Sequence, residues 1–544
     1  MTALTTEQLA DNRRKKIILA CFILLMLVDV IFTFAGFYGN DDINYARYAA
    51  GIVHNGISFS PAFDQYQLRW ATVYSTAFFY WIFGINTFTS TLSSAISFAL
   101  CGILLYKILR HQKTGIYFLS MALFFFARSV IFYSHRLLPD PTMCLAVFWM
   151  YYSYRSYLLK NHKPFLYGIQ YSFALFLAII CKETIIIALP LFAILFLRDV
   201  LKKQHFHFWK MVILLSFAFL SLYLLYFKIS TGDFFYRYSV LLRKSYFNEC
   251  SFDQLPFIFT LKRIGYELWR AMLLNGDFVI YLPGIISAIY RKKIAFTGIE
   301  KTDIFSFLIL LTCANFMTIS VSSYVPLCHS PRHFLFLFPF AAITGGPMLY
   351  AYFKKPAKFI GLLLIFAIAT AVIFSINGGT TKYLYLFITI LLFSYYLFSF
   401  IRNKKLIYTC SVILFTALLF TNYVTDFVKP LYPYYWDQKE VIQKQFSGKN
   451  INATIFSDEL SVELSGFFLN FKTGNLKFRS VDSAKNTNAG TLYYLLNRNL
   501  NPGSGNKMDS LMKKNEDSNV RMVYRKNNVF LYKVNNAILR SLKE

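Results

Sequence analysis

Long apolar segments recur along this chain from near the N-terminus to about residue 423, and short polar stretches separate them. The first, 17–36, contains a single charged residue, Asp29. The chain of 544 residues is 56% hydrophobic and only 15% charged. A water-soluble fold could not bury this much apolar surface, whereas a membrane helix needs about 20 such residues. The sequence therefore predicts a polytopic membrane protein.

The apolar runs give about thirteen candidate transmembrane helices. They cover residues 16–37, 87–109, 115–133, 141–157, 165–181, 184–198, 209–229, 271–290, 304–324, 333–353, 357–376, 381–401 and 405–423. The run at 184–198 is short for a bilayer, so we expect tilt or local thinning there. The predicted fold class is an all-α membrane bundle followed by a small soluble domain.

Lysine and arginine residues between these runs orient the predicted helices. Residues 13–16 are all basic and precede the first run, which places the N-terminus in the cytoplasm. Every predicted cytoplasmic loop is then basic, namely 107–113, 155–163, 198–210, 291–293, 354–358 and 402–405. The formal net charge of +29 is thus explained by topology and by contacts with anionic membrane lipids. It does not indicate a nucleic acid partner.

Four segments are then expected on the outer, extracytoplasmic face. They are a long loop from 37 to about 84, and the shorter 133–141, 230–270 and 324–332. Within the first, the aromatic stretch 70–83 is interpreted as a juxtamembrane or re-entrant helix, with a full span as the alternative. Cys250 and Cys328 both fall in these loops, where a disulfide between them is chemically feasible but not favoured by the pattern.

The composition becomes polar after about residue 423. Strand-like runs occur at 453–456 and 476–481, and Asn501-Pro-Gly-Ser-Gly505 is typical of a turn. Residues 521–534 alternate around Asn527-Asn528, as a hairpin does. We predict two domains: a transmembrane domain over 1–423 and an extracytoplasmic soluble α/β domain over 424–544.

Two adjacent carboxylates, Asp41 and Asp42, follow the first span at the expected outer boundary. Asp41, Tyr45 and Tyr48 fall on one face at helical spacing. A partly buried carboxylate here could take a proton from an attacking hydroxyl or amine, and its neighbour could orient a substrate or a cation. A helix cap in a solvated loop is the alternative for an isolated Asp-Asp pair.

Asp140 and Lys182 also lie at outer ends of predicted helices. Asp140 precedes Pro141, so helix capping alone would explain it, and a functional role requires that it approach Asp41. Lys182 and Glu183 separate two apolar runs, where a local ion pair is the simpler interpretation. A lysine at this level is also a suitable phosphate ligand.

Arg69, Arg332 and His333 precede later helical segments on the same predicted face. Arginine at a helix end often only extends its guanidinium toward the membrane surface. Several cations and carboxylates gathered on one face nevertheless match the needs of a lipid-linked phosphosugar, whose phosphate requires cations and whose acceptor requires a base.

In this order the motifs resemble those of the C-type polytopic glycosyltransferases, closest to the protein-O-mannosyltransferase and aminoarabinose-to-lipid-A transferase group. The resemblance covers residues 17 to about 350, although the prolines usual after Arg69 are missing. The matching segments are Asp41-Asp42-Ile-Asn-Tyr45-Ala-Arg-Tyr48-Ala49, Arg69-Trp70 through Phe83-Gly84, Asp140, Lys182 with Pro190, and Pro331-Arg332-His333 through Pro339.

The resemblance implies a membrane glycosyltransferase that moves a sugar from a polyprenyl-phosphate donor to an extracytoplasmic acceptor. Asp41 would be the general base, and Asp42 and Asp140 would orient the acceptor or bind a divalent cation such as Mg²⁺ or Mn²⁺. The substrate-binding residues would be Arg69, Tyr45, Lys182, Arg332 and His333. The acceptor could be a lipid, a protein or a glycan.

Two other functional classes remain open from the sequence. A transporter or lipid-linked-sugar flippase would place charges at the bilayer midplane, and Asp29 is the one intramembrane acid that favours it. A non-enzymatic scaffold for envelope assembly would use 424–544 as its binding module. The first span shows no cleavage-site signature of small residues, so a bacterial inner (plasma) membrane is the expected location.

Overall fold

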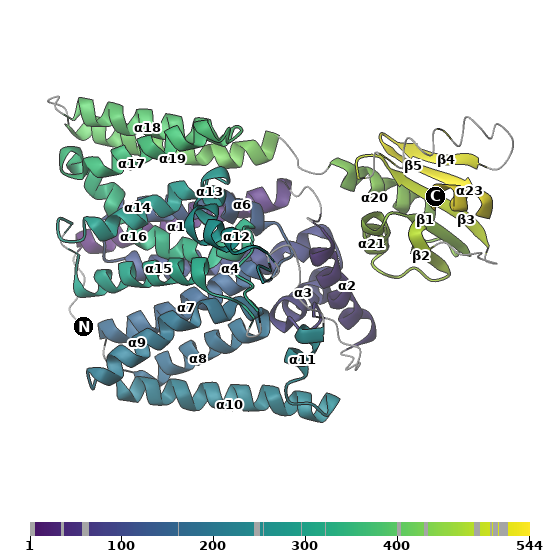
Figure 1. The fold of residues 1–544 in the computed structure, drawn as a ribbon, viewed down its shortest axis with the longest axis horizontal. Coiled ribbons are helices and arrows are strands. Elements are labelled where there is room, and N and C mark those ends of the chain that lie inside the picture. Colours follow the sequence, from purple (N-terminus) through teal and green to yellow (C-terminus); the bar gives the residue numbers. More distant parts are fainter. Residues whose placement is uncertain are drawn as a thin grey trace.

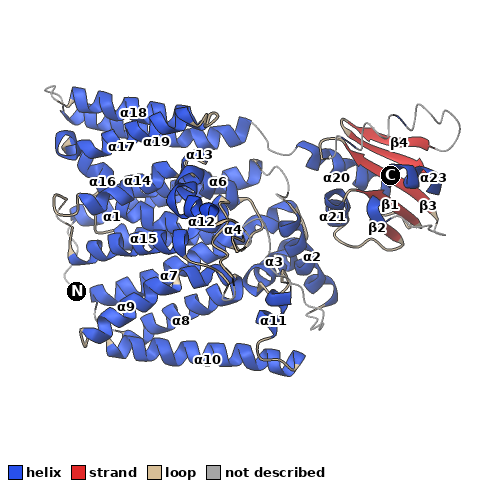
Figure 2. Cartoon of the chain, viewed as in Figure 1, coloured by secondary structure: helices blue, strands red, loops and turns tan. Residues whose placement is uncertain are grey.

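The computed structural model describes residues 6–33, 37, 39–56, 65–160, 163–243, 251–253, 255–294, 296–320, 323–399, 404–428, 433–483, 490–500, 503, 510 and 520–543. Figure 1 shows long helices running side by side in a bundle, with a smaller sheet-containing part beyond one end of it. The strands in Figure 2 all belong to that smaller part. The turn predicted at 501–505 and Cys250 lie outside the described residues.

The bundle is built from helices with the following bounds. They are α1 (Thr6–Phe32), α2 (Asn40–Asn55), α3 (Trp70–Phe83), α4 (Thr87–Leu109), α5 (Thr114–Phe125), α6 (Arg128–Ser134), α7 (Asp140–Lys160), α8 (Pro164–Cys181), η1 (Glu183–Ile187), α9 (Leu189–Leu201), α10 (Phe206–Thr231), α11 (Tyr236–Arg243), α12 (Phe257–Lys262), η2 (Arg263–Glu267), α13 (Leu268–Leu274), α14 (Phe278–Ile289), α15 (Gly298–Phe316), η3 (Pro331–Leu337), α16 (Phe338–Lys354), η4 (Pro356–Phe359), α17 (Ile360–Ser375), α18 (Thr381–Phe398) and α19 (Lys404–Val428).

Seven helices of the described chain are long and apolar enough to cross a membrane, or eight if the bent pair α5–α6 is one span. The two halves of that pair meet at 57°. The polytopic helical class is thereby confirmed, and the count of thirteen stays a prediction. The segment 70–83 forms the 14-residue α3, which at about 1.5 Å per residue is shorter than a bilayer core of about 30 Å.

The peripheral helices present apolar side chains outward, as a lipid-facing surface requires. On α10, Phe217 is 70% exposed and Leu222 is 65% exposed. In the interior, α5 and α16 approach so closely at Gly346 that a side chain would not fit there. A Cβ built at Gly346 of α16 would lie 2.9 Å from the backbone nitrogen of Ser120 on α5. Small residues allow this approach of two membrane helices.

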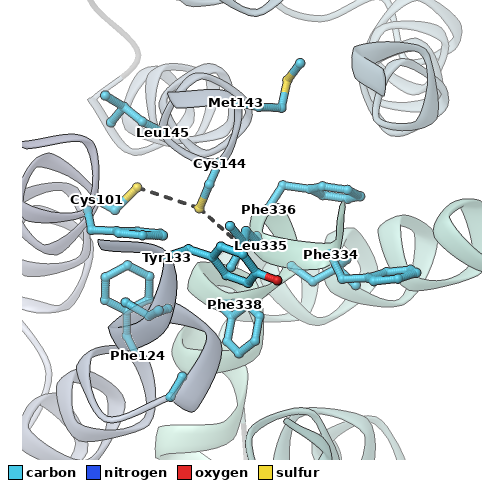
Figure 3. Close-up of a cluster of buried hydrophobic side chains, with 14 of the residues drawn as sticks. Cys101, Phe124, Tyr133, Met143, Cys144, Leu145, Phe334, Leu335, Phe336 and Phe338 are labelled. Atoms are coloured by element: carbon cyan, nitrogen blue, oxygen red, sulfur yellow. Dashed lines mark hydrogen bonds between the residues drawn. The ribbon is translucent and has the colours of Figure 1, made fainter. Parts of the chain in front are cut away.

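A buried cluster fixes the short 3₁₀ helix η3 against the bundle (Figure 3). The Cys144 thiol of α7 donates a hydrogen bond to the Leu335 carbonyl at 3.2 Å, and its sulfur lies 3.9 Å from that of Cys101 on α4. Phe124 and Phe338 pack beside them (Figure 3). Since η3 begins with Pro331, Arg332 and His333, this cluster anchors a segment that carries predicted site residues.

The C-terminal part is a five-stranded sheet with helices, which confirms the prediction of a small α/β domain. The strand order is β2-β1-β3-β5-β4, with β1 parallel to β2 and β3, and β5 antiparallel to β3 and β4. The elements are α20 (Pro433–Phe446), β1 (Ala453–Ser457), α21 (Glu459–Phe468), β2 (Leu476–Ser480), η5 (Val481–Ser483), β3 (Thr491–Asn497), β4 (Val520–Lys526), β5 (Val529–Val534) and α23 (Asn536–Lys543).

The predicted hairpin is present as β4 and β5, joined at Asn527-Asn528. Asn527 has a φ of 46°, a left-handed conformation that asparagine tolerates in tight hairpin turns. The sequence pattern did not favour a disulfide at Cys328, but Cys328, in the loop before η3, is disulfide-bonded. A disulfide requires an oxidising compartment, so it agrees with the predicted outer location of this loop.

Candidate functional site

Asp41 meets Arg332 although 291 positions separate them in the sequence. Asp41 lies in the first turn of α2, and Arg332 Nη1 is 2.8 Å from its Oδ2 atom. The Tyr66 hydroxyl donates to the other carboxylate oxygen, Oδ1, at 2.8 Å. Both oxygens of Asp41 are therefore held by donors from distant segments.

Arg69, directly before α3, is buried and lies next to this carboxylate. Its guanidinium donates to the Tyr45 hydroxyl, and Nη2 lies 3.3 Å from Oε2 of Glu183. The guanidinium carbon is 5.9 Å from the ring centroids of both Tyr45 and Tyr66. Cation–π contacts and hydrogen bonds together orient the group.

Glu183 bridges two arginines and does not pair with its neighbour Lys182. Arg237 of α11 donates to Glu183 Oε1 at 2.7 Å and to the Tyr223 hydroxyl at 3.1 Å. Burial disfavours the charge of Glu183, but Arg69 and Arg237 outweigh it and lower the pKa of this carboxyl to about 2. Arg237 was not predicted from the sequence, where only the polar and aromatic character of 230–270 was evident.

Lys182, Asp140 and His333 form a second, buried group. Lys182 Nζ lies 2.6 Å from Asp140 Oδ1 and 3.1 Å from His333 Nδ1. Because the ammonium can only donate, Nδ1 of the ring acts as acceptor and the imidazole is neutral. Asp140 Oδ2 is buried and accepts no hydrogen bond from the described residues. The local ion pair between Lys182 and Glu183 is thus absent from the structure.

Asp42 is oriented differently from Asp41. It is fully buried, and its Oδ1 accepts a hydrogen bond from the Gly39 backbone amide at 3.0 Å, as a cap of α2 does. Its predicted role toward the acceptor stays a prediction.

Asp29 of α1 is also buried. The Thr33 hydroxyl donates to its carboxylate at 3.0 Å, and His135 Nδ1 lies 3.6 Å away. These contacts account for Asp29 within the helix packing.

The charges of the two groups do not cancel. Their four cations face three carboxylates, and with His333 neutral one positive charge is in excess. The cations are Arg69, Lys182, Arg237 and Arg332, and the carboxylates are Asp41, Asp140 and Glu183. A partly buried site with excess positive charge favours an anionic ligand, and the guanidinium groups suit a phosphate.

A divalent cation is not favoured by these donors. The described residues contain no group of three His, Cys, Asp or Glu side chains placed to hold a metal ion. Each site carboxylate is paired instead with arginine or lysine. The predicted Mg²⁺ or Mn²⁺ is untested and stays a prediction, and we derive no step through it.

We expect the stabilising effect of Asp41 to be lost only in acid. Burial would raise the pKa of its carboxyl, but Arg332, Tyr66 and Arg69 outweigh burial and hold the pKa below the ordinary 3.8. The folded state thus prefers the ionised form. The contribution of Asp41 to the free energy of unfolding is complete above about pH 5 and declines as pH falls through the lowered pKa.

Thermal unfolding of wild type and Asp41→Asn between pH 8 and pH 3 tests this prediction. Their difference in unfolding temperature should be constant down to about pH 5 and shrink below about pH 4. A difference that shrinks already near neutral pH would contradict it.

Neither a protein-family model nor a curated protein sequence matches the chain. Solved structures of ArnT from Cupriavidus metallidurans do match it, each with a TM-score of 0.57 and 13% identity. The undecaprenyl phosphate complex aligns over 95% of this chain and 97% of ArnT, and the apo form over 96% and 98%. The chain has the ArnT fold. The predicted fold class, a polytopic helical bundle with a small C-terminal sheet domain, is therefore confirmed.

Proposed function

We propose that this protein is a membrane glycosyltransferase that takes a sugar from a polyprenyl-phosphate donor. The observation that carries the proposal is the pairing of Asp41 with Arg332 beside Arg69, in a cluster with one excess positive charge. A base and several phosphate ligands in one site are what such a transfer needs. The ArnT complex with undecaprenyl phosphate supports this class of donor.

Asp41 can act as the base only after the Arg332 guanidinium has left its carboxylate for another anionic group. The Arg332 guanidinium donates to Asp41 Oδ2 and lowers the basicity of the carboxylate. An incoming phosphate competes for Arg332, and likewise for Arg69 and Arg237, which share Glu183. Donor binding thereby frees the Asp41 carboxylate, so the base becomes available when the donor is in place.

The transfer itself exchanges one bond for another. The acceptor O–H or N–H proton passes to Asp41, and the acceptor atom bonds to the anomeric carbon. The bond from that carbon to the phosphate oxygen breaks, and polyprenyl phosphate leaves with its charge stabilised by the arginines. Lys182 and Asp140 form a buried pair beside His333, which follows Arg332, and Asp140 Oδ2 is available to accept a hydrogen bond from the acceptor or the sugar.

The protein is oriented in this proposal with its N-terminus in the cytoplasm, in a bacterial inner membrane. The site then faces the extracytoplasmic side together with the C-terminal domain. Membrane lipids surround the bundle, and the acceptor is a lipid, a protein or a glycan. We place the domain boundary between α19, which ends at Val428, and α20, which begins at Pro433, a few residues after the boundary predicted from the sequence.

Transfer by purified protein tests the proposal. Protein in detergent is incubated with radiolabelled polyprenyl-phosphate sugars and with envelope glycolipids and glycoproteins, and released polyprenyl phosphate and labelled acceptor are measured. We expect stoichiometric release and labelling. Counterflow of an intact lipid-linked sugar in liposomes, without cleavage of the sugar–phosphate bond, would instead establish a transporter.

A further inference from the structure

The C-terminal domain contacts α2, the helix that carries Asp41. Arg47 Nη1 lies 3.1 Å from Oε1 and 3.3 Å from Oε2 of Glu463 on α21. One residue before the end of α2, His54 Nε2 lies 2.8 Å from the backbone oxygen of Asn470, just after α21. Figure 1 shows α2 at the end of the bundle that faces α21.

A third contact lies immediately before α2. Phe37 is buried, and its ring packs edge-on against Phe467 of α21 at 4.7 Å between centroids and against Tyr435 of α20 at 6.1 Å. The C-terminal domain therefore holds α2 before its start, in its middle and near its end. Aromatic edge contacts specify orientation as well as proximity, and the ion pair adds a charge-assisted hydrogen bond between the two parts.

These contacts and the site residues occupy different faces of α2. Asp41 and Tyr45 are four residues apart and face Arg332 and Arg69. Arg47 and His54 are seven residues apart, two turns, and lie on the face that meets the C-terminal domain. A rotation or shift of α2 at one face thus moves the Asp41 carboxylate at the other.

We propose that Arg47 and Glu463 are positioning residues through which the C-terminal domain sets the place of Asp41 in the site. This rests on the proposed glycosyltransferase function and adds a role for the domain within the reaction. Reaction geometry is sensitive, since a displacement of about 1 Å can cost about 100-fold in rate. The pair is partly exposed, with 42% of the Arg47 side chain accessible, so its substitution should spare the fold.

Charge reversal tests the proposal. We expect Arg47→Glu and Glu463→Arg each to lower kcat about tenfold while the donor KM changes less than about twofold, because the phosphate ligands are untouched. The double reversal restores an attractive pair and should recover kcat to within about threefold of wild type. Lys444→Gln removes the exposed ion pair with Glu440 inside the C-terminal domain and should leave kcat unchanged.

Hydrogen exchange of the α2 amides, 40–55, separates failure of this inference from failure of the function. Each single reversal should accelerate exchange in α2, and the double reversal should restore protection. If wild type transfers sugar and the single reversals match it in kcat, the positioning role is wrong and the function stands. If wild type transfers no sugar, the proposed function is wrong, and unchanged α2 exchange in the single reversals would refute the coupling itself.

Discussion

An Asp41→Asn protein is expected to lose sugar transfer by about 10²–10⁴-fold, the usual contribution of a positioned general base. The amide keeps the size of the carboxylate, but its single oxygen can replace only one of the two carboxylate oxygens that accept from Tyr66 and Arg332, and it cannot take a proton from the acceptor. The loss should appear in kcat, with a smaller effect on the donor KM. Initial rates with purified donor and acceptor provide the measurement.

Folding should survive this substitution. The Asp41 side chain is 32% exposed and its pair with Arg332 is partly solvated, so its removal should cost about 0–1 kcal/mol. Asp437→Asn makes the same chemical change at a carboxylate that accepts from Asn527 in the C-terminal domain, and it should transfer sugar at the wild-type rate. Asp41→Glu should retain part of the activity, because a carboxylate remains. Wild-type turnover in Asp41→Asn, together with loss of sugar transfer in Asp140→Asn, would indicate that Asp140 is the general base.

The general architecture could be predicted because it depends on local patterns. Apolar length identified the helical segments, and alternation around Asn527-Asn528 identified the β4–β5 hairpin. The helix start at Asp140 followed from Pro141, since proline fits the first helical turn. These signals act over a few residues, so they need no knowledge of the tertiary packing.

The pairings within the site could not be predicted in the same way. Asp41 and Arg332 meet only because α2 and η3 are brought to the same end of the bundle. At Lys182 the local interpretation was wrong for a physical reason: its backbone is extended, with φ of −158° and ψ of 146°. This extended residue separates α8 from η1, and the two neighbouring side chains point to different groups: Lys182 reaches Asp140, whereas Glu183 reaches Arg69 and Arg237. Arg237 shows no motif beyond a basic residue in a predicted outer loop.

The Asp140–Lys182 pair should have a large effect on the free energy of unfolding. Both side chains are buried, with about 5% of each exposed, and their atoms are 2.6 Å apart. Asp140→Asn leaves the Lys182 ammonium without its counter-ion, and Lys182→Met leaves the Asp140 carboxylate in the same condition. Each single substitution should therefore cost about 3–5 kcal/mol.

The double substitution Asp140→Asn/Lys182→Met removes both charges and should cost less than the sum of the singles by at least about 2 kcal/mol. Unfolding in detergent, followed by tryptophan fluorescence in wild type and the three variants, measures this coupling. The cycle Arg47→Gln/Glu463→Gln is the matched control, because that pair is partly exposed and should couple by about 0–1 kcal/mol. Additive costs at Asp140 and Lys182 would show that the two charges do not depend on each other. The strong coupling that we expect has a functional consequence. Lys182 and Asp140 can separate only when an incoming group replaces the interaction that each loses. Simple solvent ions cannot replace both interactions, whereas a ligand that carries both hydrogen-bond donors and acceptors can.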